Sequence, residues 1–348
     1  MSELTNTPDE KLPFYLKKNR GLGRFKPGDD LLHPASFADI KDDSATETQY
    51  FGFSVPEAGI HALTYMWWHP NLKVCSGGLV VFQGIKHHTI EAELCDWRTF
   101  MSDAALKNDL HEFRFDNGYG VKVIEPEKRF HVTYADPANE NSVDLMFEAL
   151  LPAVLTAEGN HLDQTMKVKG ELLLRGKRYA IDCYNVRDRS WGKPRPETVM
   201  PLPPMSWMTG VFRDDFSFNC TVLDHASGQP ERNGKFVVPD DQALNTGWVC
   251  KDGKVGCIVS AFKRVIRSPG SPISSAIDLR FTDEHGRRFE IQGSMVASCP
   301  ISVYNNVLVV VNLMRWDCDG LVGHGDNQDA MWGPFVSSAV FRGEQTAF

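Results

Sequence analysis

The chain has 348 residues, with 37 Lys and Arg against 45 Asp and Glu, 42% hydrophobic residues and 11% aromatic residues. This composition is typical of a soluble globular protein and excludes collagen-like, coiled-coil and disordered chains. The formal net charge of −8 repels phosphate backbones and anionic lipid surfaces, so nucleic acid is not an expected partner.

The N-terminus has no basic segment followed by an apolar one, and the longest apolar run, Val307–Val311, is far too short to span a membrane. The eight cysteines include no C-x-x-C pair, which is typical of reduced core thiols. We therefore expect a cytoplasmic protein without a membrane span. The sequence contains no nucleotide-binding or zinc-protease motif, so it predicts no cofactor and no metal site. It does not define an oligomeric state.

The first forty residues are polar and rich in Lys, Asp and Pro, and we expect them to form an N-terminal arm. A helical period is visible near Thr99–Leu110, whereas two-residue alternation bounded by turn residues recurs from Gln49 to the end. Ile60–Gln83 is typical of a hairpin, with its turn at His69-Pro70-Asn71. The alternation predicts an all-β protein with few short helices.

Two further hairpins follow along the chain. Gln164–Leu174 and Arg178–Val186 flank a turn that contains Gly176, and Ala276–Phe281 is expected to pair with Arg288–Gly293. Between them, Lys193–Pro204 contains five prolines and cannot lie inside a sheet. We place the domain boundary there, with domains 1–196 and 197–348, each long enough for one antiparallel β-barrel of about eight strands.

The first strand of the central hairpin has one apolar face, formed by Met166, Val168 and their alternate neighbours. This face must point into the barrel. Gln164 shares it, and a buried amide needs hydrogen-bond partners, so Gln164 is a better pocket candidate than Asp163. On the returning strand, Tyr184 and Asp188 point one way and Arg187 the other. The alternation alone does not decide which set is inside.

The returning strand ends in Arg187-Asp188-Arg189-Ser190-Trp191-Gly192, where a carboxylate stands between two guanidiniums. Paired arginines lower the pKa of such a carboxylate and an apolar wall raises it. One interpretation is an ion pair between Asp188 and an arginine that fastens the strand end, with Trp191 as a plug. The other is a catalytic carboxylate.

The runs His161–Gln164, Val168–Gly170, Gly176–Ile181 and Arg187–Gly192 resemble the signature of the lipocalin-like hydroxyneurosporene synthase (carotenoid hydratase) superfamily, and Met205–Phe212 resembles the next strand of that family. The resemblance implies two tandem lipocalin-like β-barrels and a hydratase, dehydratase or cyclase of lipophilic molecules. The residue before the aspartate is usually apolar or aromatic in the carotenoid enzymes. Here it is Arg187, which argues against a carotenoid substrate.

If the reaction type carries over, an acid held in a dry pocket protonates an alkene and water attacks the cation. We expect Asp188 to be the acid, His161 to share the proton transfer, Gln164 or Tyr184 to orient water, and an arginine to set the protonation of Asp188. The expected catalytic residues are Asp188, His161 and Tyr184. The expected substrate-binding residues are Gln164, Met166, Arg187, Arg189, Trp191, Trp207 and His69.

The leading hypothesis is therefore a cofactor-independent hydratase or dehydratase acting on a lipophilic small molecule such as a terpenoid, steroid or prenylated aromatic. A carrier that binds an apolar ligand without changing it is the competing hypothesis, and an isomerase or cyclase is a third. The late segment Gly323–Asp329 combines His, Asp and Gly and is interpreted as a polar loop at the rim of the second barrel.

Overall fold

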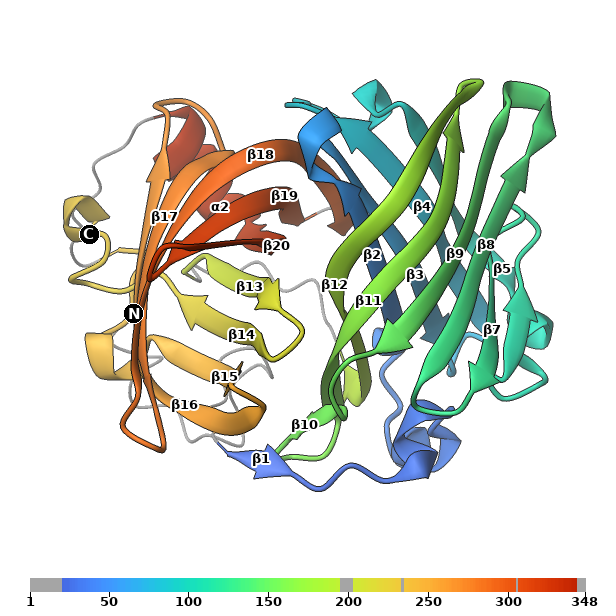
Figure 1. Ribbon diagram of the computed structural model, residues 1–348, viewed down its shortest axis with the longest axis horizontal. Coiled ribbons are helices and arrows are strands. Elements are labelled where there is room, and N and C mark those ends of the chain that lie inside the picture. The colour runs from blue at the N-terminus through green and yellow to red at the C-terminus, as the bar shows by residue number, and fades with distance from the viewer. Residues whose placement is uncertain (1–20, 195–202, 233–234, 305, 343–348) are drawn as a thin grey trace. The chain divides into compact units, whose positions relative to one another are not determined.

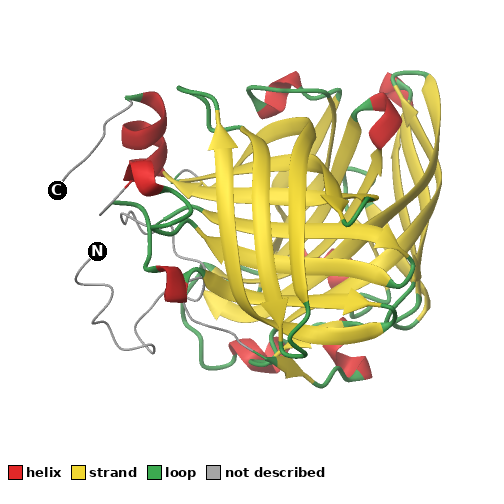
Figure 2. Ribbon diagram, turned by 60° about the vertical axis from the view of Figure 1, so that its left-hand side comes forward, coloured by secondary structure: helices red, strands yellow, loops and turns green. Residues whose placement is uncertain are grey.

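The computed structural model describes residues 21–194, 203–232, 235–304 and 306–342. The chain divides into two compact units, an N-terminal unit of Gly23–Pro196 and a C-terminal unit that contains Glu197–Phe348. Both are built from antiparallel strands with a few short helical segments (Figures 1 and 2), which confirms the all-β prediction. The predicted boundary at 196/197 and residues 1–20 of the predicted arm lie outside the described residues.

The strands of the N-terminal unit form one long curved sheet. Its hydrogen-bonded order is β5-β4-β3-β2-β12-β11-β9-β8-β7-β6, with β10 on β11. The strands are β1 (Leu22–Gly23), β2 (Ala45–Val55), β3 (Ile60–His69), β4 (Val74–Gln83), β5 (Leu94–Ser102), β6 (Glu112–Arg114), β7 (Gly120–Glu125), β8 (Arg129–Asp136), β9 (Asn141–Ala149), β10 (Val154–Thr156), β11 (His161–Leu174) and β12 (Lys177–Pro194). Short 3₁₀ segments join them: η3 (Pro27–Asp30), η4 (Pro34–Phe37), η5 (Pro56–Ala58), η6 (Thr89–Glu91), η7 (Asp103–Leu106) and η8 (Pro137–Asn139).

The two ends of this sheet, β5 and β6, are joined by side chains. Asn117, between β6 and β7, is buried and donates its Nδ2 hydrogens to the carbonyl oxygens of Gly77 (3.2 Å) and Asp96 (2.9 Å). The Tyr134 hydroxyl on β8 donates to the Asp96 carboxylate at 3.0 Å. These bonds fasten together two sheet ends that share no described strand ladder.

The C-terminal unit contains a closed barrel of eight strands in sequence order, β13 to β20. The strands are β13 (Met205–Arg213), β14 (Phe216–Leu223), β15 (Leu244–Lys251), β16 (Lys254–Arg267), β17 (Ser274–Asp283), β18 (Arg288–Tyr304), β19 (Val307–Cys318) and β20 (Leu321–Trp332). The helical segments are η9 (Pro230–Arg232), η10 (Asp240–Gln242), α2 (Gly333–Phe335) and the π-helical η11 (Val336–Phe341). Closure leaves the barrel no free strand edge.

All three predicted hairpins are confirmed, as β3–β4, β11–β12 and β17–β18. In the β11–β12 turn, Arg175 and Gly176 adopt φ values of 49° and 77°. Positive φ at both central residues is the requirement of a two-residue hairpin turn whose twist matches the strands. Gly176 meets this requirement without the steric cost that a side chain carries.

Two local predictions were wrong. The expected helix near Thr99–Leu110 is the end of β5 followed by the single 3₁₀ turn η7, and positive φ values at Phe100, Asp109 and Leu110 interrupt any helical path. The expected loop at Gly323–Asp329 lies within β20. Its polar residues suggested solvent, but Asn327 and Asp329 are fully buried inside the barrel.

Each unit has its own apolar core. Phe51, Phe130 and Phe147 pack together in the N-terminal unit, and Phe218 packs against Trp316 in the C-terminal unit. All eight cysteines are free thiols, and all but Cys95 are buried, as expected for reduced core thiols. Among the described residues, we find no helix with the length and apolar character that crossing a membrane requires.

Candidate active site

The pairing of β11 with β12 decides which side chains point into the N-terminal barrel. Residues directly opposite each other in an antiparallel pair lie on the same face. Gln164 stands opposite Arg187, whereas Asp163 stands opposite Asp188. Met166 and Val168 belong to the core, so Gln164 and Arg187 face inward and Asp163 and Asp188 face outward. The sheet therefore separates Gln164 from Asp188, which we had expected to share one pocket.

On the inner face, Arg187 is fully buried and fully engaged. Its guanidinium donates to both carboxylate oxygens of Asp30, at 2.8 and 3.0 Å, and to Gln164 Oε1 at 2.8 Å. The guanidinium also lies 4.3 Å from the centre of the Phe130 ring. Gln164 Nε2 donates to the carbonyls of Glu127 and Leu151. Each polar side-chain atom of these two predicted substrate-binding residues thus has a protein partner.

Arg189 extends this inner ionic cluster towards the end of the barrel. It pairs with the buried Glu47 carboxylate, which also accepts hydrogen bonds from the His33 backbone and contacts the His33 ring. The His33 ring stacks on Trp191 at 4.0 Å. The expected ion pair between Asp188 and a neighbouring arginine is wrong, because Arg187 and Arg189 face inward and pair with Asp30 and Glu47. Trp191 is buried against His33, and its role as a plug stays a prediction.

Burial raises the pKa of Asp30, but the facing Arg187 guanidinium, together with Arg189 and His33, outweighs burial and holds the pKa below its usual value. A carboxylate in this state is a firm ion-pair partner and a poor proton donor at neutral pH. The inner cluster is thus suited to fasten η3 to β12.

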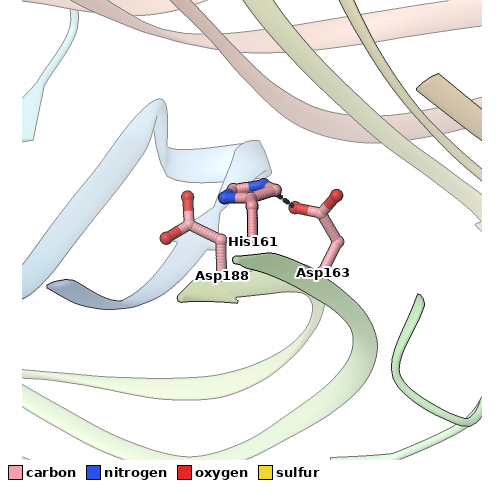
Figure 3. Close-up of side chains that lie close together, drawn as sticks. All are labelled: His161, Asp163 and Asp188. Atoms are coloured by element: carbon pink, nitrogen blue, oxygen red, sulfur yellow. Dashed lines mark hydrogen bonds and ion pairs between the residues drawn. The ribbon is translucent and has the colours of Figure 1, made fainter. Parts of the chain in front are cut away.

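The outer face carries a different group of side chains. His161, Asp163 and Asp188 bring one ligand atom each to within 4.8 Å of one another, and the His161 ring lies between the two carboxyl groups (Figure 3). His161 Nε2 is 3.2 Å from Asp163 Oδ1. Asp163 and Asp188 are only 2% and 9% exposed. We call these three residues the outer triad.

The outer triad arises directly from strand geometry. His161 and Asp163 are two residues apart on β11, so they share a face, and Asp188 is the direct cross-strand partner of Asp163. Carboxyl and imidazole groups are the side chains that most often donate and accept protons in enzymes. Carboxylate and imidazole groups are also ligands for divalent cations. The triad can thus exchange protons or hold a cation.

An aromatic row lies beside the triad on the outer face of β2, β3 and β5. Tyr50 is the cross-strand neighbour of Asp188 on β2 and of Tyr65 on β3. Consecutive ring centres are 5.7 Å apart for Tyr50–Tyr65 and 5.6 Å for Tyr65–Trp67, and Trp97 on β5 lies 5.8 Å from Trp67. The faces of such rings attract cations.

The remaining predicted site residues divide between the two units. His69 lies on β3 at the end of the aromatic row, 6.4 Å from Trp67. Tyr184 is on the outer face of β12, where its ring receives Lys167 Nζ at 4.2 Å. Met166 is part of the inner apolar core. Trp207 lies on β13 of the C-terminal unit, on the strand face opposite to the core residue Met208.

Sequence reasoning missed part of this site. Asp163 was set aside in favour of Gln164, and the aromatic row of Tyr50, Tyr65 and Trp97 was not proposed. A signal was present for Asp163, because its two-residue spacing from His161 places both on one face. No sequence signal joins Tyr50 to Asp188, because their contact depends on the pairing of β2 with β12.

The family described as Domain of unknown function (DUF7064) matches residues 26–330, and no curated protein matches the chain. An AttH-like protein from Nitrosomonas europaea is similar in structure over 90% of this chain and 97% of its own, with 12% identity and a TM-score of 0.59. Kievitone hydratase from Nectria haematococca is similar over 90% and 97%, with 10% identity and a TM-score of 0.48. CghA is similar over 83% and 88%, with 8% identity and a TM-score of 0.49.

The likeness to the AttH-like structure concerns the fold, and it confirms the expected tandem lipocalin-like architecture. Membership of the hydroxyneurosporene synthase superfamily stays a prediction. The matched segment covers most of the sequence. The chain therefore belongs to the family described as Domain of unknown function (DUF7064).

Proposed function

We propose that the protein is a cofactor-independent hydratase or dehydratase that acts on a lipophilic small molecule by acid–base catalysis at the outer triad. The observation that carries this proposal is the outer triad itself, a buried carboxyl pair with an imidazole, next to an aromatic row on the same sheet face. Acid, base and cation-stabilising surface are the three groups that hydration of an alkene requires.

In the hydration direction, the Asp188 carboxyl gives its proton to one alkene carbon. Its O–H bond breaks as a C–H bond forms, and a carbocation remains on the other carbon. The rings of Tyr50 and Tyr65 stabilise that cation. A water molecule forms the C–O bond and releases a proton to His161, whose positive charge Asp163 offsets. Passage of this proton to Asp188 restores the starting state, and dehydration follows the reverse path.

The aromatic row also indicates the kind of substrate. Its rings meet at interplanar angles of 48°, 78° and 88°, so they offer apolar ring faces and edges, which suit a terpenoid, a steroid or a prenylated aromatic compound. The net charge of −8 disfavours polyanionic substrates. The guanidinium groups of Arg187 and Arg189 are not part of this surface, because they pair with carboxylates on the inner face of the sheet.

The central test replaces Asp188 by Asn, which keeps the shape of the side chain and removes its proton. We expect turnover to fall by about 100-fold or more, the usual contribution of a general acid. The matched control is Asp182→Asn, on the same strand but with its side chain 65% exposed, which should retain turnover. A folded Asp188→Asn variant with full activity would rule out the assigned acid.

The reaction class is tested separately in water enriched in heavy oxygen. A hydratase incorporates the label into its product, and a dehydratase incorporates it into its alcohol substrate through the reverse reaction. An isomerase or cyclase gives a product without the label. A carrier leaves its ligand unchanged while the ligand alters the tryptophan fluorescence in a saturable manner. The first outcome supports the proposal, and either of the others contradicts it.

A further inference from the structure

The closed barrel of the C-terminal unit contains a row of polar side chains in its interior. Ser298 on β18 pairs across the strands with Asn312 on β19, and Asn312 pairs with Asn327 on β20. All three are fully buried. Asn312 lies two and four residues before the core residues Met314 and Trp316 on β19, so the three side chains share one face of the strand. The row therefore faces the inside of the barrel.

Hydrogen bonding fixes the orientation of the Asn312 amide. Its Nδ2 donates to the carbonyl oxygens of Val310 (3.2 Å) and Asn327 (3.0 Å). Exchanging the nitrogen and oxygen would bring Oδ1 against two carbonyl oxygens, so the observed orientation is the favourable one. Asn312 Oδ1 therefore points elsewhere, and it has no hydrogen-bond donor in the described part of the chain.

The two cross-strand neighbours of Asn312 also have side-chain oxygens that lack a hydrogen-bond partner within the described ranges. Among the residues that the structure describes, neither Ser298 Oγ nor Asn327 Oδ1 has a hydrogen-bond partner. The Asn327 amide nitrogen is engaged with Ser274 Oγ at 3.2 Å. Buried polar atoms in native proteins are nearly always satisfied by protein or by ordered water. Three such atoms on adjacent strands thus indicate a common missing partner.

The charges nearby decide what kind of partner fits. An ionic cluster lies next to the row, since Asp329 is two residues beyond Asn327 on the same face of β20. Its members are Arg232, Lys263, Arg267, Asp224 and Asp329. Three cations against two carboxylates leave an excess of positive charge, which disfavours a bound cation. Amide oxygens are acceptors and disfavour an anion.

We infer that ordered water binds inside the closed barrel of the C-terminal unit, bridging Asn312 Oδ1 to Ser298 Oγ and to Asn327 Oδ1. Water is neutral, donates two hydrogen bonds and accepts bonds from a hydroxyl, so it complements two amide oxygens and one serine. The site is independent of the outer triad and of the proposed reaction. It couples the polar side chains of β18, β19 and β20.

A crystal structure of the full chain, grown without polyols, tests the inference. We expect a water peak within hydrogen-bond distance of Asn312 Oδ1 and of at least one of its two neighbours. An Asn312 Oδ1 that accepts directly from a protein donor, with no density beside it, would overturn the inference.

Magnetic relaxation dispersion, which counts long-lived internal waters, gives a second test in solution. Asn312→Leu should lower the count by one or more, whereas Asn108→Leu at an exposed turn should leave it unchanged. If Asn312→Leu does not fold, Ser298→Val replaces it, because a methyl group then occupies the place of the hydroxyl. An unchanged count in the folded variant contradicts the inference.

Discussion

Asp188 and the arginines on either side of it have separate roles, although they are consecutive in sequence. Side chains alternate across a strand, so Arg187 and Arg189 enter the barrel while Asp188 leaves it. The arginines bind Asp30 and Glu47, which lie more than a hundred residues earlier in the chain. The sequence predicted the charged strand end, but the long-range partners of the arginines depend on the path of the chain from η3 to β2.

The Asp30–Arg187 pair makes a prediction about stability. Removing one member of a buried ion pair costs about 3–5 kcal/mol, so we expect Asp30→Asn to lower the free energy of unfolding by that amount at pH 7. The folded pKa of Asp30 is depressed, so its contribution is present above the unfolded pKa and is lost as pH falls through the folded one. The difference in the free energy of unfolding between wild type and variant should therefore narrow below about pH 4.

Urea denaturation between pH 2 and pH 7 measures this difference. Asp29→Asn is the matched control, because the partly buried Asp29 carboxylate accepts a local bond from the Lys26 backbone, which an amide oxygen can also accept. The control should follow the wild type at every pH. A difference for Asp30→Asn that stays constant in acid contradicts the assigned coupling.

At the scale of elements, the N-terminal sheet is closed by side chains at β5 and β6 and by backbone everywhere else along its path. Individual hydrogen bonds contribute less than a ladder, and an unsatisfied buried group costs about 1–3 kcal/mol. We call the side-chain contacts that join β5 to the β6 end of the sheet the seam. The seam is thus the weakest junction of this sheet.

Asn117→Ala should destabilise the protein by about 1–3 kcal/mol, because the carbonyl oxygens of Gly77 and Asp96 lose a donor. Hydrogen exchange should rise first in β5 and β6 and should stay slow in β11 and β12. The control is Asn108→Ala, at an exposed turn nearby, which should leave exchange unchanged. Equal acceleration across the whole sheet contradicts a local seam.

Elements were predicted well where one face is apolar and badly where it is not. The alternation of β11 was clear because Met166 and Val168 enter an apolar core. The segment of β20 around Asn327 was read as a loop because its inward side chains, Asn327 and Asp329, are polar although they are fully buried. Polar interiors remove the signal on which strand prediction depends.

At the scale of the whole molecule, the two units have separate apolar cores with no shared member among the described residues. The all-β class and the tandem arrangement followed from strand periodicity, turn residues and the family resemblance. The closed eight-stranded barrel of the C-terminal unit was expected as well and is confirmed. The open path of the first sheet was not expected, since it depends on pairings between distant strands such as β2 and β12.

Separate cores predict separate unfolding. Calorimetry of the full chain should resolve two transitions. Arg187→Met should lower the midpoint temperature of one transition, because it breaks a buried ion pair in the N-terminal unit. Lys263→Met should lower the midpoint of the other, because it removes a buried ammonium that pairs with Asp224 at 2.8 Å. A single transition that both variants shift equally would show that the units unfold as one.

The pairing of β2 with β12 has a consequence for biogenesis. The ribosome delivers β2 with its tyrosine well before β12, and nearly 140 residues separate Tyr50 from its partner Asp188. Contacts of such long range form slowly. The aromatic row lies on β2, β3 and β5, which are synthesised first, and the outer triad lies on the later β11–β12 hairpin. The two parts of the proposed site are therefore separate in the nascent chain. Only when β12 docks onto β2 are the two parts of the proposed site brought together.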